Sequence, residues 1–258
     1  MIHEDASIRD CTLYHGDCLE VMKAMPSGCA DITVTSPPYN LMGQYSDKSQ
    51  MGQNFTPDRL NGWYEDAMCE EEYQAWQRDI LNECVRVTNG PVFYVHQVRY
   101  AWGRKNKWYH PVHWLDGFQV WAEIIWNRGS GISATKRPTM ADQRIYMIGK
   151  PVVWNKPECT SVWDIPADRN SEHPCPFPIE LVGRCLRMAS AKGCAVFDPF
   201  MGSGTTGVAA LNTGRKFIGI ELDERYFAVA KARLQNVEFE RDLFSATPTA
   251  TAATGDTA

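Results

Sequence analysis

The chain has 258 residues, of which 44% are hydrophobic and 22% charged, and its formal net charge is −5. This length and composition can bury a substantial core in one domain, which excludes the disordered and fibrous classes. The negative charge argues against indiscriminate nucleic-acid binding, and no apolar run approaches the roughly 20 residues of a membrane-spanning helix.

The predicted elements alternate between strands and helices along the chain. Short apolar segments flanked by turn residues predict strands at 11–15, 30–35, 91–96, 118–126, 143–149, 194–198 and 216–221. Apolar residues at helical spacing predict helices at 18–25, 70–87, 178–190, 205–212 and 223–235. This alternation favours a mostly parallel, doubly wound α/β sheet with helices on both faces.

Other stretches lack a regular pattern. Residues 41–69 and 97–117 look irregular, and long irregular stretches in a compact domain are often functional. We expect 41–69 to be a mobile loop that closes over a site. The low-complexity tail, 246–258, cannot bury enough surface to become ordered, which leaves 1–245 as a single domain.

The predicted strand at 30–35 runs directly into a polar and rigid segment, "SPPYN", at residues 36–40. Two consecutive prolines restrict the backbone, so the hydroxyl and carbonyl groups beside them need little reorganisation. Taken alone, this segment is best explained as an ordinary proline turn after a strand.

A glycine-rich turn follows the predicted strand at 194–198. The sequence "DPFMGSGTTG" places Gly202, Gly204 and Gly207 in the pattern G-x-G-x-x-G, which allows a sharp turn and close approach to a ligand. Glu221 lies 23 positions beyond Asp198, at the end of the next predicted strand. An acid at this spacing is typical of a ribose contact, so the pattern predicts a cofactor that contains a nucleoside.

The glycine turn comes late in the chain, after which we find no further strong β segment. The N-terminal segment "CTLYHGDCLEVM" supplies a strand, an acidic turn and a helix start. We therefore expect a permuted sheet in which residues 11–15 form the strand beside 216–221.

Four segments together resemble one protein family: "SPPY", "HPCPFP", "DPFMGSGTT" and "GIELDERYFAVAKARL". In this order they are similar to the beta class of S-adenosylmethionine-dependent DNA amino-methyltransferases, whose catalytic motif precedes the cofactor motif. The resemblance covers residues 11–40 and 118–236. It implies a seven-stranded Rossmann-like sheet in circularly permuted order, in a cytoplasmic, nucleoid-associated protein encoded by a prokaryote or a phage.

The resemblance also implies which residues contact S-adenosylmethionine. Those matching the family's methionine and backbone contacts are Asp198, Phe200, Gly202, Gly204 and Thr205, with Glu221 on the ribose. Those matching the adenine turn and the methionine wall are Asp17, Cys18, His173, Pro174 and Phe177. An N-cap on helix 18–25 explains Asp17 equally well.

Within this family, Ser36, Pro37, Pro38 and Tyr39 would form the catalytic segment. The Ser36 hydroxyl and the Pro37 carbonyl can accept hydrogen bonds from the exocyclic amine of a flipped base, on which Tyr39 stacks. Serine in first place favours cytosine N4, with adenine N6 as the alternative, because a hydroxyl can donate or accept.

Target recognition in this class lies between the two motifs, here at about 127–172. The candidates for contacts with double-stranded DNA are Arg128, Lys136 and Arg137, joined by Lys105 and Lys107. Scattered, solvated cations are the alternative. Trp108 could face the duplex or belong to the core. A homodimer and a cognate restriction endonuclease are compatible with the family.

Nine cysteines without a C-x-x-C pair predict reduced thiols and no metal site. Cys175 follows a proline, as the nucleophile of C5-cytosine methyltransferases does, but it precedes a helix, so we interpret it as incidental. Two more distant alternatives are a nicotinamide-dependent dehydrogenase, which leaves Ser36 to Tyr39 unexplained, and a non-catalytic DNA-binding relative.

Overall fold

The computed structural model describes residues 6–8, 10–40, 68–101, 107–129, 140–155, 160–167 and 178–237. Its strands are β1 (Ala6–Ile8), β2 (Cys11–His15), β3 (Ile32–Thr35), β4 (Val92–His96), β5 (Arg99–Ala101), β6 (Lys107–Tyr109), β7 (Val120–Asn127), β8 (Asp142–Ile148), β9 (Val162–Asp164), β10 (Ala195–Asp198) and β11 (Lys216–Glu221). Its helices are α1 (Cys18–Ala24), α3 (Glu70–Val87), α4 (Val112–Leu115), α5 (Ile179–Ala189), α6 (Thr205–Asn212) and α7 (Glu224–Gln235).

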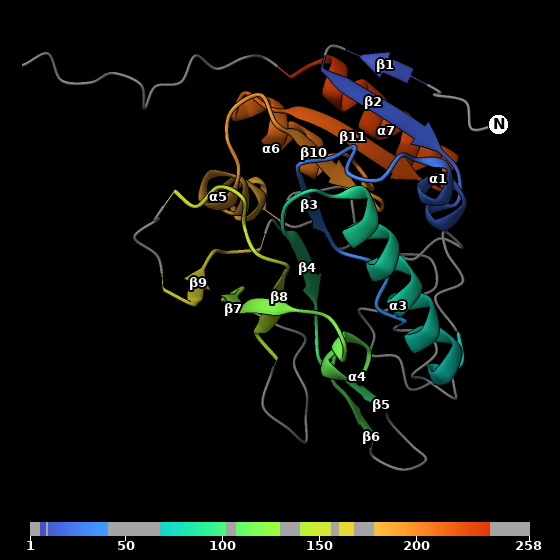
Figure 1. The fold of residues 1–258 in the computed structure, drawn as a ribbon, viewed down its shortest axis with the longest axis vertical. Helices are drawn as coiled ribbons and strands as arrows, with labels where there is room; N and C mark the ends of the chain where they lie inside the picture. Colours follow the sequence, from blue (N-terminus) through green and yellow to red (C-terminus); the bar gives the residue numbers. More distant parts are fainter. Residues whose placement is uncertain are drawn as a thin grey trace, which may run out of the picture.

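One sheet organises the described residues, in the order β1-β2-β11-β10-β3-β4-β8-β7-β9 (Figure 1). Neighbouring strands from β2 through β4 are all parallel, as are β7 and β9. The antiparallel pairs involve β1, at one edge, and β8, between β4 and β7. The prediction of a mostly parallel sheet is confirmed.

The sheet has nine strands among the described residues, so the predicted number of seven is wrong. The two additional strands are β1 and β9, which contain three residues each and lie at the two edges. Segments this short are below the length at which an alternating pattern can be recognised.

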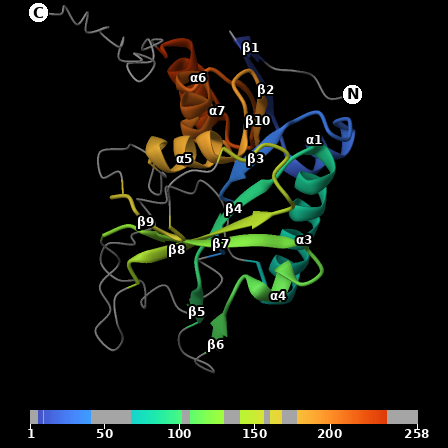
Figure 2. The ribbon, with the colours of Figure 1, turned by 60° about the vertical axis from the view of Figure 1, so that its left-hand side comes forward.

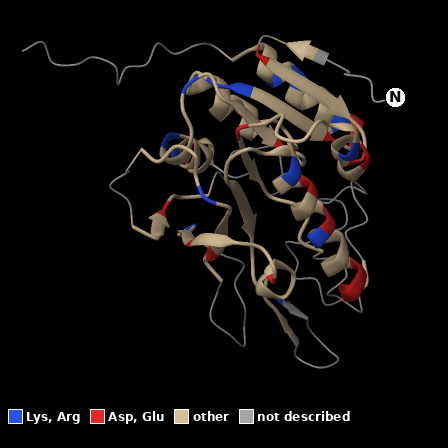
Figure 3. Ribbon diagram, viewed as in Figure 1, with Lys and Arg blue, Asp and Glu red and all other residues tan. Residues whose placement is uncertain are grey.

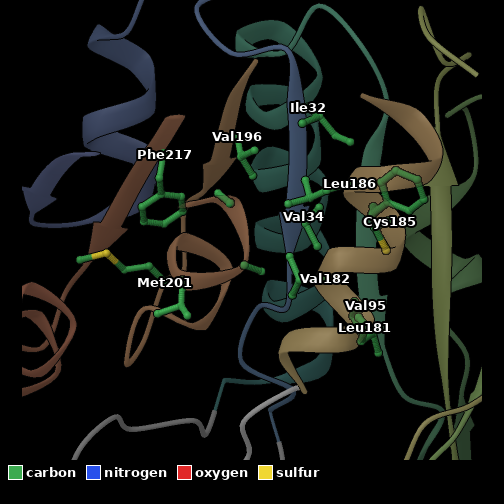
Figure 4. Packing of buried hydrophobic residues seen from close by; sticks show 14 of the residues in the cluster. Ile32, Val34, Val95, Leu181, Val182, Cys185, Leu186, Val196, Met201 and Phe217 are labelled. Atoms are coloured by element: carbon green, nitrogen blue, oxygen red, sulfur yellow. The ribbon is translucent and has the colours of Figure 1, made fainter. Parts of the chain in front are cut away.

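Helices cover both faces of the sheet, as predicted (Figure 2). Apolar residues of α5, α6 and α7 pack on one face in a single cluster, and those of α1, α3 and α4 pack on the other. In the first cluster, Ile32 and Val34 of β3 lie beside Val182 and Leu186 of α5 (Figure 4). The strand that leads into "SPPYN" is therefore in the middle of the core.

The first strong strand pairs with the last, as predicted. β2 lies parallel to β11, with His15 opposite Glu221, and the Gly16 amide donates to the Glu221 carbonyl at 2.9 Å. The turn after β2 and the acid at the end of β11 consequently lie next to each other at the carboxyl ends of these two strands.

The region 97–117, predicted to be irregular, contains regular structure. Its described residues form the antiparallel hairpin strands β5 and β6 and the four-residue helix α4. Such short elements carry little periodicity, and long-range packing stabilises this region: Trp114 of α4 is fully buried. Most of the predicted mobile loop and the whole predicted tail lie outside the described residues. Where the chain is described, none of its helices is long and apolar enough to span a membrane.

Candidate active site

The "SPPY" segment and the glycine turn meet at the carboxyl ends of two interior strands of the sheet. They follow β3 and β10, which are parallel neighbours, so the carboxyl ends of both strands lie side by side. A buried hydrogen bond of 2.8 Å from the Thr35 hydroxyl to Asp198 Oδ1 joins the two strand ends. Segments separated by more than 160 positions therefore form a single polar site.

Within the "SPPY" segment, the side chains of Ser36 and Tyr39 contact each other. Their hydroxyl oxygens lie 2.7 Å apart, and the Tyr39 hydroxyl donates to Gln143 Oε1 at 3.2 Å. The Tyr39 ring lies 4.6 Å from the His96 ring, centroid to centroid. The segment ends at Asn40, whose φ of 53° lies in the left-handed region that asparagine tolerates.

A buried polar network supports the segment from below. The Pro38 carbonyl accepts from the Tyr73 hydroxyl at 2.8 Å and from Gln77 Nε2 at 3.3 Å, both side chains of α3. Gln77 Nε2 also donates to the Tyr73 oxygen, while Gln77 Oε1 accepts from the Tyr94 hydroxyl. The Trp114 indole N–H in turn donates to Tyr94. This network ties the turn rigidly to α3 and β4.

His96 closes the network as a neutral imidazole. Its Nδ1 lies 2.7 Å from the Gln97 carbonyl, to which it donates. Nε2 is then an acceptor and lies 2.7 Å from the Tyr73 hydroxyl, whose single hydrogen it shares with the Pro38 carbonyl. Complete burial, with the nearby Arg99 guanidinium, lowers the pKa of His96 to about 3. The ring is therefore uncharged at neutral pH and acts as a support rather than as an acid.

The glycine turn has the backbone geometry expected from its sequence. Gly202 and Gly204 have φ values of 52° and 83°, in the left-handed region that favours glycine. The Gly202 amide donates to Glu221 Oε2 at 2.8 Å, and the Asp223 amide donates to Oε1 at 2.9 Å. Burial raises the pKa of Glu221. Each carboxylate oxygen has another lone pair, so Glu221 can still accept from a ligand hydroxyl.

Asp198 holds the start of the glycine turn. It accepts from Thr35 Oγ1, from the Phe200 amide at 3.0 Å and from Thr206 Oγ1 at 2.7 Å. Burial nevertheless raises its pKa to about 6, because desolvation outweighs the three hydrogen bonds. Asp198 thus connects the end of β3, before the "SPPY" segment, to the glycine turn.

Asp17 is the N-cap of α1, as one of the two interpretations predicted. Its Oδ1 accepts from the Leu19 and Glu20 amides at 2.9 and 3.0 Å. Cys18 is buried beside it, and burial raises the pKa of its thiol. Because the turn is tied to Glu221 by the Gly16 amide, the predicted adenine and ribose contacts lie together.

The remaining described cofactor candidates contact residues that the sequence did not single out. The Phe200 ring lies 5.7 Å from the Trp76 ring of α3, in an edge-to-face arrangement. Thr205 Oγ1 accepts from Arg233 of α7 at 3.1 Å. Tyr73, Trp76 and Gln77 share one face of α3, and a glutamine in the buried stripe of an amphipathic helix is the signal that would have pointed to them.

The candidate DNA contacts are only partly described. The Arg128 guanidinium lies 5.9 Å from the Trp126 ring centroid. The other DNA candidates lie outside the described residues: Lys105, Lys136, Arg137 and the side chain of Lys107. The same holds for three of the cofactor candidates, His173, Pro174 and Phe177. Trp108 is 51% exposed, so a core role for it is wrong.

Two arginines near the candidate DNA contacts pair with carboxylates. Arg99 is buried and pairs with Glu70, while Arg144 pairs with Glu123 and Asp142. Lys and Arg are interspersed with Asp and Glu on the described elements, for example along α3 (Figure 3).

Comparison with known proteins finds a family model described as DNA methylase, of the N6/N4 type, which matches residues 150–232. A similar sequence is the type II methyltransferase M.ScaI of Streptomyces caespitosus, 28% identical over 88% of this chain and 82% of M.ScaI. Another is the DNA adenine methyltransferase YhdJ of Escherichia coli, 27% identical over 86% of this chain and 82% of YhdJ.

Solved structures agree in fold. The protein TTHA0409 of Thermus thermophilus, complexed with S-adenosyl-L-methionine, superimposes with a TM-score of 0.61 and 27% identity. The match covers 86% of this chain and 93% of the other.

Proposed function

We propose that the chain, which is similar to DNA amino-methyltransferases, is an S-adenosylmethionine-dependent enzyme of this kind and methylates the N4 amine of cytosine in double-stranded DNA. The observation that carries the proposal is the hydrogen bond between Thr35 and Asp198. Because of this contact, an amine held by the "SPPY" segment would face a ligand held by the glycine turn.

The geometry of the glycine turn fits S-adenosylmethionine. Two left-handed glycines let the backbone approach a ligand closely, and the Glu221 carboxylate suits ribose hydroxyls. In this proposal Asp17 and Cys18 border the adenine, and Phe200 lies near the methionine part. When bound, the cofactor supplies an electrophilic methyl group. The residues of the chain bind and orient it.

The "SPPY" segment would hold the target amine. An exocyclic amine is a weak nucleophile because its lone pair is delocalised into the ring. Ser36 Oγ and the Pro37 carbonyl can accept its two hydrogens, which directs the nitrogen lone pair toward the methyl donor. Catalysis then depends on positioning and polar stabilisation, without a covalent intermediate on the enzyme. Flipping costs a few kcal/mol, and stacking on Tyr39 compensates for part of this cost.

Two observations bear on the target base. The serine at position 36 supports cytosine N4, because this residue is commoner among cytosine enzymes of the class. The similarity to YhdJ, a DNA adenine methyltransferase, supports adenine N6 as the second candidate. Both bases present an amine beside a ring nitrogen, so the same residues would serve either reaction.

We also propose a permuted order for the domain, supported by the pairing of β2 with β11. In this arrangement the catalytic strand β3 precedes the cofactor strand β10 in sequence and lies next to it in the sheet. The segment 127–172 would carry target recognition, with Arg128 among its DNA contacts.

The test is to incubate unmethylated DNA with the protein and isotope-labelled S-adenosylmethionine, then digest the DNA to nucleosides for mass spectrometry. We expect labelled N4-methylcytosine, and its loss in Ser36→Ala and Tyr39→Ala. Labelled N6-methyladenine alone would reverse the base assignment, and no label in either nucleoside would reject the proposal.

A further inference from the structure

Gln143 is placed to act on the catalytic segment although it lies 104 positions away in the sequence. It belongs to β8, opposite Trp126 of β7, and only 7% of it is exposed. A buried side chain on an interior strand of the sheet has little freedom. Its Oε1 accepts the hydrogen bond from Tyr39 described above.

The directions of the hydrogen bonds follow from counting hydrogens. A tyrosine hydroxyl has one hydrogen, and here Tyr39 gives it to Gln143 Oε1. The 2.7 Å contact between Ser36 and Tyr39 must then use the Ser36 hydrogen, with Tyr39 as the acceptor. The chain of hydrogen bonds therefore runs from Ser36 to Tyr39 to Gln143.

Resting on the proposed function, we infer that Gln143 is a positioning and specificity-determining residue that makes Ser36 an obligatory hydrogen-bond acceptor for the target base. A free serine hydroxyl can either donate or accept. With its hydrogen committed to Tyr39, Ser36 presents only lone pairs to the base. An amine satisfies them, whereas a carbonyl oxygen at the same place would be repelled.

This arrangement selects bases by the group at the reacting position. Cytosine carries an amine where uracil and thymine carry a carbonyl, and adenine carries one where guanine and hypoxanthine do. Without the acceptor on Gln143, the Tyr39 hydrogen can turn to Ser36, whose own hydrogen can then turn to the base. The site would lose its preference for an amine.

The experiment compares the parent with two variants. Gln143→Met keeps the length of the side chain and lacks the amide acceptor, whereas Gln143→Glu keeps an acceptor oxygen. Affinities are measured, with S-adenosylhomocysteine present, for two duplexes that carry cytosine or uracil at the site the parent methylates. If the parent methylates adenine, the pair is adenine and hypoxanthine. Methyl-transfer kcat and cofactor KM are measured in parallel.

We expect Gln143→Met to reduce the amine-over-carbonyl affinity ratio by about tenfold, the value of one hydrogen bond, and to lower kcat with an unchanged cofactor KM. Gln143→Glu should restore both. Tyr39→Phe, which removes the intermediate hydroxyl, should show the same loss of ratio and serves if Gln143→Met fails to fold.

Three results would overturn the inference. In one, Gln143→Met keeps the parent ratio. In another, Gln143→Glu loses the ratio as fully as Gln143→Met does, which would indicate a merely structural role. In the third, the parent methylates no DNA, and the proposed function then fails together with the inference. A methylating parent with an unchanged ratio in Gln143→Met rejects the inference alone.

Discussion

Asp198 illustrates how burial and hydrogen bonding compete at a single carboxylate. Three donors favour its charged form, from Thr35, Thr206 and the Phe200 amide. Only 2% of the residue is exposed, so the cost of desolvating the charge is larger than this gain. Because burial raises the pKa of Asp198 to about 6, this carboxylate takes up a proton in mildly acidic solution. The free energy of unfolding therefore depends on pH.

The first prediction concerns this dependence. The pKa of Asp198 is about 6 in the folded protein and 3.8 as the ordinary value, so the folded state binds the proton more tightly. The contribution of Asp198 to the free energy of unfolding therefore falls as the pH rises from about 3.8 to about 6, and it is constant well above pH 6. Between about pH 5 and 7.5 the parent should lose about 1 kcal/mol relative to Asp198→Asn in urea denaturation. A difference that is constant or grows with pH would contradict this account.

At the scale of elements, α3 supports the "SPPY" segment. Its residues Tyr73 and Gln77 lie one helical turn apart and both reach the Pro38 carbonyl. Both are buried, so neither can exchange these partners for water. A helix packed on the sheet thus determines the position of a turn that no regular element contains.

The second prediction removes this support. In Gln77→Leu the Tyr94 hydroxyl and the Pro38 carbonyl lose a partner in a buried environment, which should cost about 2 kcal/mol in the free energy of unfolding. Methyl transfer should slow as well, because the turn is less restricted. Gln235→Leu, an exposed position of α7, is the control and should change stability by less than about 0.5 kcal/mol. Equal effects of the two substitutions would contradict the role of the network.

The third prediction concerns packing of α6 behind the glycine turn. A Cβ on Gly207 would lie 2.7 Å from Phe217 and 2.8 Å from Leu234, both fully buried, so Gly207→Ala should cost about 1–3 kcal/mol. Gly183 of α5 is the matched control, because its Cβ would meet only the tip of the Arg187 side chain. Thermal unfolding should show Gly183→Ala unchanged or stabilised by up to about 1 kcal/mol. A neutral Gly207→Ala would show that α6 can move away from β11.

For the whole molecule, sequence patterns predicted the long elements and missed the contacts between them. The helices α3 and α6 and the strands β2 and β11 have their predicted bounds, because their apolar spacing and flanking turns are local signals. The meeting of the two motifs followed from parallel topology. Tyr73, His96 and Gln143 were missed, because they reach the site through tertiary packing from other elements, which no local pattern records.

The last prediction tests whether the assembled edge of the sheet binds the expected cofactor. At a concentration of about 100 times its Kd, a ligand stabilises the folded state by about 2.7 kcal/mol. For a chain of this size, S-adenosylmethionine should then raise Tm by about 5–10 °C. Ser36→Ala should keep this shift while losing methyl transfer, because Ser36 lies outside the glycine turn. Nicotinamide dinucleotide should leave Tm unchanged, since the site formed by the glycine turn, Glu221 and the turn after β2 is proposed to bind S-adenosylmethionine. A shift with the nicotinamide cofactor alone would favour the dehydrogenase interpretation and contradict the role of Glu221 and the N-terminal turn as a joint site for S-adenosylmethionine.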